Sequence, residues 1–514
     1  MGENVEESKP ETILRHIFEG ICLTVFAYLF VLSLFSVVYS SRDPENDIAF
    51  LITESPVKSI LYLMGYSLFL FIVLSLVLRL LKKINLNAIG IIVSILSIGI
   101  AISTALCIKI HPWADYAICC NLADQFNSGN FTDYFQPGSY ISMVPYQLGL
   151  ISVERILLAV FGSRYEVLQY AMIPTVGLFT YSGFRICAKL SNNNTASCFL
   201  YFWLVLTFIP LYLYITVPYG DLPSTAFLMF ACYITLEFLD NPKWWKGILI
   251  FTACLLALLV RTNSLIFFIG FGIVLILLYR NYKKKCIQLF LIFLSAFIIS
   301  KASVSLMYDK YRTKDTQIPY IAWLVMGMNY DTYGWWNNYV FALMERSNND
   351  TGEASKIAKA ELKDEMTDYG KNPGKLAELF YQKSQVQWNA PMLQSMNLTK
   401  LDIDEKNVYH SLYFGSLRPI AEKFMNVTLS FIYGWFCVYL VFGFIDKNRK
   451  ISDYLFTIGI LGGFIFTMMW ESKTRYGFPY ILMLLPLVAV GFGTVLIKIL
   501  DKLPFEKKEK TCAN

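Results

Sequence analysis

The feature that most constrains this chain is a succession of long apolar runs with short polar segments between most of them. An α-helix rises about 1.5 Å per residue, so about 20 apolar residues cross the hydrocarbon core of a bilayer. Only 16% of the 514 residues are charged, against about 25% in soluble domains, which excludes a soluble globular protein. We therefore predict an all-α polytopic membrane protein with about 12 transmembrane helices, at 17–39, 58–80, 88–108, 166–188, 197–217, 222–239, 246–260, 263–280, 287–307, 426–445, 455–470 and 478–499.

Basic residues in the short loops predict the orientation of the bundle, because lysine and arginine gather on the cytoplasmic side of membrane proteins. Both termini are then cytoplasmic, in a multi-pass protein of the cell membrane. The net charge of +6 is therefore weak evidence for a polyanionic partner. We expect membrane lipids and no nucleic acid as partners. The basic clusters comprise Arg79, Lys82, Lys83, Lys243, Lys246, Arg280, Lys283, Lys284, Lys285, Lys447, Arg449, Lys450 and Lys498.

One apolar segment, 139–162, complicates the count because Glu154 and Arg155 lie in its middle. A crossing there would invert the orientation of every later basic cluster. We expect an amphipathic helix on the outer surface instead, with a thirteenth crossing as the alternative.

This topology divides the chain into five parts and sends two long loops to the outer face, where a reaction is then expected. The large second loop contains two stretches of helical composition, 353–370 and 373–388. The five parts are a cytoplasmic tail with two leading helices (1–87), a transmembrane core (88–307) with the first outer loop at 109–165, a large outer loop or cap (308–425), the C-terminal transmembrane helices (426–500) and a basic cytoplasmic tail (501–514).

Ionisable residues near the membrane plane are costly to bury unless they serve a site. His111, Asp115 and Tyr116 follow the third run, with Asp124 further on. A carboxylate here can act as a general base toward a hydroxyl group, or Asp115 can cap a helix. Asp221 lies in the sequence PYGDLP, where turn composition alone explains its presence.

Two further groups combine cations with amide or aromatic residues. Arg261 and Asn263 form a tight turn between two apolar runs, where the guanidinium can bind a lipid phosphate or snorkel to headgroups. The group after the eleventh run suits either a phosphate and sugar platform or an interfacial belt. Its members are Glu471, Lys473, Arg475 and Tyr476. With three histidines, and cysteines mostly inside apolar runs, we expect no histidine-rich metal site and no disulfide framework.

Several stretches, in this order, resemble the GT-C superfamily of lipid-linked glycosyltransferases, in particular the branch of protein O-mannosyltransferases and aminoarabinose transferases. They are HPWADYAICCNLADQFNSGNFTDYF with PYQLG after it, PYGDLP, LVRTNSLIF, IPYIAWLVMGMNYDTYGWWN and WESKTRYGFPYILMLLPLVAVGFG, within residues 88–500. The resemblance implies a GT-C type bundle that transfers a sugar from a polyprenyl-phosphate donor outside the cytoplasm, with inversion at the anomeric carbon. Asp115 is followed by Tyr116 rather than by a second acidic residue, which departs from many eukaryotic protein O-mannosyltransferases. This departure puts a protein acceptor in doubt. The two apolar spans before residue 88 and the 308–425 loop, which lacks a recognisable accessory domain, favour the bacterial envelope branch, with a wall polymer or lipid glycan as acceptor.

The resemblance also implies roles for individual residues. Asp115 matches the acidic residue of the first loop that serves as catalytic base. Arg261, Arg475 and Lys473 would bind the donor phosphate, whose departure needs mainly charge stabilisation. A divalent ion between Asp115 and the phosphate stays open as an alternative. The residues that would line the site are His111, Tyr116, Asp124, Asp221, Asn263, Glu471 and Tyr476.

Two other functions stay open at this stage. A lipid-glycan flippase or transporter would also need many crossings, and such proteins tend to show internal repeats and broken helices; this sequence has no clear repeat. A non-enzymatic membrane receptor would use 308–425 as its recognition domain. It would not require polar residues from separate turns to converge.

Overall fold

The computed structural model describes residues 9–41, 49–80, 85–312, 315–398, 400–445 and 451–502. Within these ranges seven helices are long and apolar enough to cross a membrane, or nine if each of two bent helix pairs makes one crossing. The predicted class, a helical polytopic membrane protein, is confirmed. Two more apolar helices, α11 (Trp244–Val260) and α19 (Thr457–Met469), are shorter. The count of about 12 crossings stays a prediction.

The helices follow one another with few strands between them. The first half of the chain contains α1 (Lys9–Phe35), α2 (Pro56–Leu80), α3 (Leu86–Cys107), α4 (Ala114–Asn127), α5 (Tyr140–Met143), α6 (Leu148–Phe161), α7 (Tyr165–Leu190), α8 (Thr195–Thr207), α9 (Ile209–Leu213) and α10 (Asp221–Asp240). The second half contains α11, α12 (Leu265–Tyr308), α13 (Tyr320–Met328), α14 (Tyr339–Arg346), α15 (Thr351–Lys371), α16 (Pro373–Trp388), α17 (Val408–Tyr413), α18 (Leu417–Ile445), α19 and α20 (Phe478–Leu500).

Short 3-10 turns and two antiparallel strand pairs complete the structure. The 3-10 turns are η1 (Thr132–Phe135), η2 (Pro145–Gln147), η3 (Tyr214–Thr216), η4 (Thr262–Ser264), η5 (Asp309–Tyr311), η6 (Ile451–Tyr454) and η7 (Thr474–Gly477). Strand β1 (Ser36–Ser40) pairs with β2 (Ala49–Thr53), and β3 (Lys109–His111) pairs with β4 (Lys400–Asp402).

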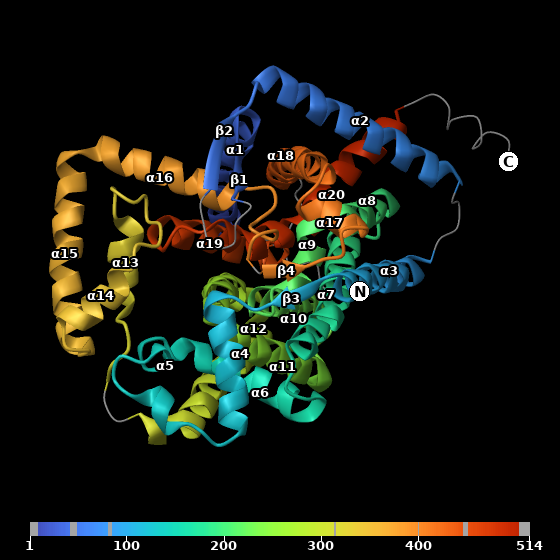
Figure 1. Ribbon diagram of the computed structural model, residues 1–514. Helices are drawn as coiled ribbons and strands as arrows, with labels where there is room; N and C mark the ends of the chain where they lie inside the picture. Colours follow the sequence, from blue (N-terminus) through green and yellow to red (C-terminus); the bar gives the residue numbers. More distant parts are fainter. Residues whose placement is uncertain are drawn as a thin grey trace.

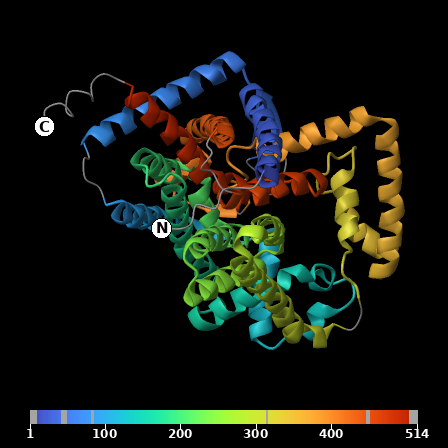
Figure 2. The same cartoon turned by 180° about the vertical axis from the view of Figure 1, so that it is seen from behind.

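Helix α20 lies inside the bundle, and most of its residues are buried (Figure 1). It packs against α7, α8, α10 and α18, while α1 packs against α18 and α10 packs against α11. Figure 2 shows from behind how the yellow-green helix α12 borders the half of the bundle that contains α10 and α11. Large apolar side chains stay exposed on α2 and α12, for example Leu61, Leu68, Ile276 and Leu294. Such surfaces are expected to face lipid.

Two predicted helix boundaries change in the structure. The predicted helix 17–39 ends at Phe35, and Val37, Val38 and Tyr39 belong to β1, because β-branched and aromatic side chains favour a strand. The predicted helices 263–280 and 287–307 form one element, α12, which is interrupted at Tyr282 by a non-helical φ of −134° and ψ of 38°.

The segment 139–162 is not the single amphipathic helix that we expected. It forms α5, η2 and α6. The helical stretch Pro145–Phe161, which comprises η2 and α6, makes an angle of 109° with the following helix α7. Helix α6 has 14 residues, which at about 1.5 Å per residue is too short to cross a bilayer alone. Glu154 is 3% exposed and lies on a helix that packs against α4, so the polar middle of this segment faces protein.

The predicted outer loop 308–425 contains the two helices expected from its composition. The stretch 353–370 lies in α15 and the stretch 373–388 is α16. With α13 and α14 they form an arm on one side of the bundle (Figure 1). The end of α16 and the chain after it, residues 383–397, are buried throughout. This part of the loop is therefore an internal support of the bundle.

Some predicted basic clusters lie outside the described residues. They are Lys82, Lys83, Lys447, Arg449, Lys450 and the tail from 503 onward.

Candidate functional site

A buried ion pair joins the end of α11 to the first turn of α10. Nη2 of Arg261 lies 3.1 Å from Oδ1 of Asp221, and the two side chains are 15% and 6% exposed. The amino end of α10 favours a carboxylate because helix dipoles add up to a partial positive charge there. Asp221 is thus a buried partner and not a solvated turn residue, and Arg261 does not snorkel to headgroups.

Gly220 allows the two chain segments of this ion pair to approach each other. A Cβ atom at this position would lie 2.0 Å from the carbonyl oxygen of Val260, so the backbones would have to separate. We expect Gly220→Ala to lower the free energy of unfolding by about 1–3 kcal/mol. Thermal melting of the purified protein in detergent measures this. Gly374→Ala is the control, since its Cβ would meet no atom within 4 Å; equal melting temperatures would contradict the prediction.

The turn 470–477, between α19 and α20, is buried although it is rich in polar residues. Glu471 and Arg475 are 4% and 7% exposed. Tyr476 donates a hydrogen bond of 2.7 Å to Oε2 of Glu471, and Nζ of Lys473 lies 3.5 Å from Oε1 of the same carboxylate. An interfacial belt would turn these groups toward headgroups, so the burial favours a site.

Arg475 has no carboxylate within ion-pair distance in the described part of the chain. Among the described residues it forms no ion pair, and its buried Nε has no hydrogen-bond acceptor. The guanidinium lies 5.2 Å from the ring centre of Tyr219 and 5.6 Å from that of Tyr476. These cation–π contacts offset only part of the cost of removing a charge from water. An anionic ligand would complete this environment.

Helix α4 presents Asp115 at its first turn. Trp113 occupies the N-cap position and its side chain forms no capping hydrogen bond, so Asp115 is a residue of the first turn and not the N-cap. Ala114 has a φ of +51°, a left-handed conformation that is unfavourable for residues with a Cβ and is often found at functional sites.

Electrostatic contacts show that Asp115 belongs to the same region as the two arginines. The negative charge of Asp115 interacts with the guanidinium of Arg475 and with the phenol groups of Tyr146 and Tyr219. Tyr219 in turn lies 4.8 Å from the guanidinium of Arg261. We call Asp115, Asp221, Arg261, Glu471, Lys473 and Arg475 the charged cluster. Its three carboxylates balance its three cations.

Two tyrosines of this region were missed by the sequence analysis. Tyr219 accepts a hydrogen bond from Gln147 and lies beneath both arginines. Tyr146 packs edge-on against Trp323 at 6.4 Å, and the charges of Asp115 and Glu471 both act on it. The motifs PYGDLP and PYQLG contain these residues, but tyrosine is so common in apolar sequences that no signal singled them out.

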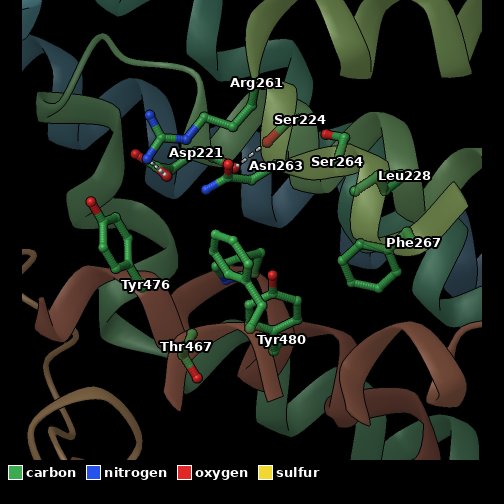
Figure 3. A pocket seen from close by; sticks show the side chains of 12 residues that line it. Asp221, Ser224, Leu228, Arg261, Asn263, Ser264, Phe267, Thr467, Tyr476 and Tyr480 are labelled. Carbon is green, nitrogen blue, oxygen red and sulfur yellow. Dashed lines mark hydrogen bonds and ion pairs between the residues drawn. The ribbon is translucent and has the colours of Figure 1, made fainter. Parts of the chain in front are cut away.

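A small pocket lies beside the Arg261–Asp221 pair. Figure 3 shows Asp221, Arg261 and Asn263 on one side, facing Tyr476 and Tyr480 on the other. The pocket thus combines charged, amide and aromatic side chains from four parts of the chain. Its remaining lining residues are Ser224, Leu228, Ser264, Phe267, Phe466, Thr467 and Pro479.

Two further predicted site residues lie outside the charged cluster, and a third borders it. His111 is exposed on β3, where its backbone is paired with that of Lys400. Tyr116 is buried and donates a hydrogen bond of 2.7 Å to the carbonyl oxygen of Leu398. Asp124, at the other end of α4, accepts a hydrogen bond from Ser163. Tyr116 follows Asp115 on α4 and the charge of Arg475 acts on it, whereas the length of the helix separates Asp124 from Asp115.

Comparisons with known proteins add no relative of this chain. No protein-family model matches it, and no curated protein matches it either. In the described part of the chain, no group of three or more histidine, cysteine or acidic residues is arranged to bind a metal ion.

Proposed function

We propose that this protein is a membrane glycosyltransferase that moves a sugar from a polyprenyl-phosphate donor to a cell-envelope acceptor, a wall polymer or lipid glycan. The reaction would take place on the outer face of the cell membrane, with inversion at the anomeric carbon. The motifs that resemble GT-C enzymes suggest this chemistry, and the charged cluster supplies residue types suited to it.

The observation that carries the proposal is the environment of Arg475. A guanidinium that is 7% exposed and has no carboxylate partner among the described residues favours a phosphate, because arginine binds phosphate oxygens with paired N–H groups. Arg261 shares Tyr219 with Arg475 but is already paired with Asp221. Arg475 would therefore contribute most of the charge that holds the donor.

A groove beside the charged cluster would hold the lipid chain of this donor. Tyr146, on which the charges of Asp115 and Glu471 act, is one of its lining residues. Its walls combine apolar residues with polar and charged ones, among them Lys301, Asp309 and Arg312. One wall is the second half of α12, whose outward side chains are exposed hydrophobic residues. The apolar lining residues include Leu148, Leu258, Leu259, Val304 and Ile318.

The chain's own residues suggest how transfer would proceed. Asp115 would accept the proton of the acceptor hydroxyl group as its oxygen attacks the anomeric carbon. The bond between that carbon and the phosphate oxygen breaks, and the polyprenyl phosphate leaves with the electron pair. Arg475 would stabilise the charge that develops on the phosphate. A divalent ion near Asp115 remains an open alternative.

Donor binding tests the proposal directly. We expect purified wild-type protein in lipid nanodiscs to bind a glycosyl polyprenyl phosphate and to release its sugar to an envelope extract. Arg475→Met should weaken donor binding by about 10- to 100-fold, since hydrogen bonds to charged groups contribute about 1.5–3 kcal/mol each. Binding is measured by competition with a fluorescent polyprenyl phosphodiester. Arg346→Met, at an exposed arginine of α14, is the control.

The same assay separates the alternatives. A flippase would move the lipid between leaflets of a vesicle without releasing sugar, and a receptor would bind an acceptor but no polyprenyl phosphate. Either result with wild-type protein would overturn the proposal. The charged cluster brings together residues from α4, α10, α11 and the 470–477 turn. A receptor would not require this convergence, so the arrangement weighs against that alternative.

A further inference from the structure

A fully buried lysine connects the predicted outer loop to the charged cluster. Lys383 lies on α16 and is 0% exposed. Its ammonium group donates hydrogen bonds to the carbonyl oxygens of Gly327, in α13, and Trp470, after α19. Gly334, with a φ of +73°, leaves the necessary space, because a Cβ there would lie 2.8 Å from Nζ of Lys383. One side chain thus holds three segments together.

The segments around Lys383 also fix the turn that carries Arg475. The backbone N–H of Ser472 donates to the carbonyl oxygen of Gly334 at 2.8 Å, and the Ser472 hydroxyl donates to that of Tyr333 at 2.8 Å. Trp470, whose carbonyl accepts from Lys383, directly precedes Glu471. A displacement of Lys383 would therefore reach Glu471 directly through the chain, and it would reach Arg475 through the 470–477 turn that Ser472 fixes.

Lys383 also has an electrostatic link to the cluster. Burial lowers the pKa of Lys383 to about 7, and the charge of Glu471 opposes this shift. Among the described residues of the elements that pack against Lys383, the charged group that acts on its ammonium is the carboxylate of Glu471. Its charge therefore changes near neutral pH. A neutral amine keeps two N–H donors, so both carbonyl groups stay satisfied in either state.

We propose that Lys383 is a positioning residue that fixes the 470–477 turn and takes up a proton when an anionic donor binds to the charged cluster. The inference rests on the proposed function, because it assumes a phosphodiester as the ligand. The cluster has as many carboxylates as cations, so a bound phosphodiester would leave one negative charge in a buried site. Protonation of Lys383 would compensate that charge, and by linkage the protonated form would bind the donor more tightly.

The test uses decaprenyl methyl phosphate, a phosphodiester whose own charge is constant between about pH 5 and 9. We expect wild-type protein in nanodiscs to bind it about five to ten times more tightly at about pH 6 than at about pH 8.5, as estimated for charges that interact across a partly buried site. The affinity of Lys383→Met should not depend on pH. Lys375→Met, at an exposed lysine of the same helix, should behave like the wild type.

Two measurements keep the test decisive if Lys383→Met folds poorly. Calorimetry of wild-type binding in two buffers of different ionisation enthalpy should show proton uptake at about pH 7.5; no uptake would overturn the inference. The melting temperature of the wild type should rise from about pH 7 to 10, relative to Lys383→Met, because the unfolded lysine still binds a proton where the folded one does not. If the wild type does not bind the probe at any pH, the proposed function fails instead.

Discussion

Arg261→Met is expected to lower the free energy of unfolding by about 3–5 kcal/mol, because it leaves the carboxylate of Asp221 buried without a partner. Asp221 is 6% exposed on its side chain, and its Oδ2 atom has no hydrogen-bond partner among the described residues. Chemical or thermal unfolding in detergent measures the loss. The exposed pair of Arg346 and Glu361 is the control, since Arg346→Met should cost no more than about 1 kcal/mol.

The double variant Arg261→Met/Asp221→Leu separates stability from function. Replacing a buried ion pair with apolar residues of similar size is often neutral, so most of the lost stability should return. Donor binding should stay weaker than in the wild type, by a smaller factor than in Arg475→Met, because the guanidinium beside the pocket is still missing. Full recovery of both properties would mean that Arg261 has a structural role only.

The sequence predicts the membrane class and the positions of most helices because the length of an apolar run directly reflects the thickness of the bilayer. Helices α15 and α16 were also predictable, since their composition favours helix. Strand β1 was not, because its apolar residues continue a helical run without a break. The kink at Tyr282 lies where the sequence predicts a boundary between two helices, in the segment 280–285, which contains four basic residues.

The members of the charged cluster could be named from the sequence because each lies beside the end of an apolar run. Their partners could not be assigned. The pairing of Arg261 with Asp221 joins residues 40 positions apart. That Arg475 forms no ion pair with any described residue emerges only from its three-dimensional surroundings. Lys383 lies in a segment with the polarity of a surface loop, so its complete burial depends on contacts with Gly327 and Trp470 that no local pattern reveals.

Asp115→Asn is expected to reduce the rate of sugar transfer by about 10²–10⁴-fold, the usual contribution of a general base. Asparagine has nearly the same shape as aspartate but does not accept the proton of the acceptor hydroxyl group. The affinity for the donor should change less in Asp115→Asn than in Arg475→Met, because Asp115 acts on the acceptor and not on the donor phosphate. Single-turnover transfer from a radiolabelled glycosyl polyprenyl phosphate measures the chemical step, and competition binding measures the affinity.

Asp124→Asn is the matched control, since Asp124 lies on the same helix and is bonded to Ser163 at its far end. It removes the same charge from α4 without touching the cluster, so its transfer rate should match the wild type within about threefold. If Asp115→Asn transfers sugar at the wild-type rate, Asp115 is not the base. If both variants lose activity equally, the charge of α4 as a whole matters and the strained backbone at Ala114 has no special part in presenting Asp115. A loss confined to Asp115→Asn, with donor affinity preserved, would assign the proton transfer to the first turn of α4.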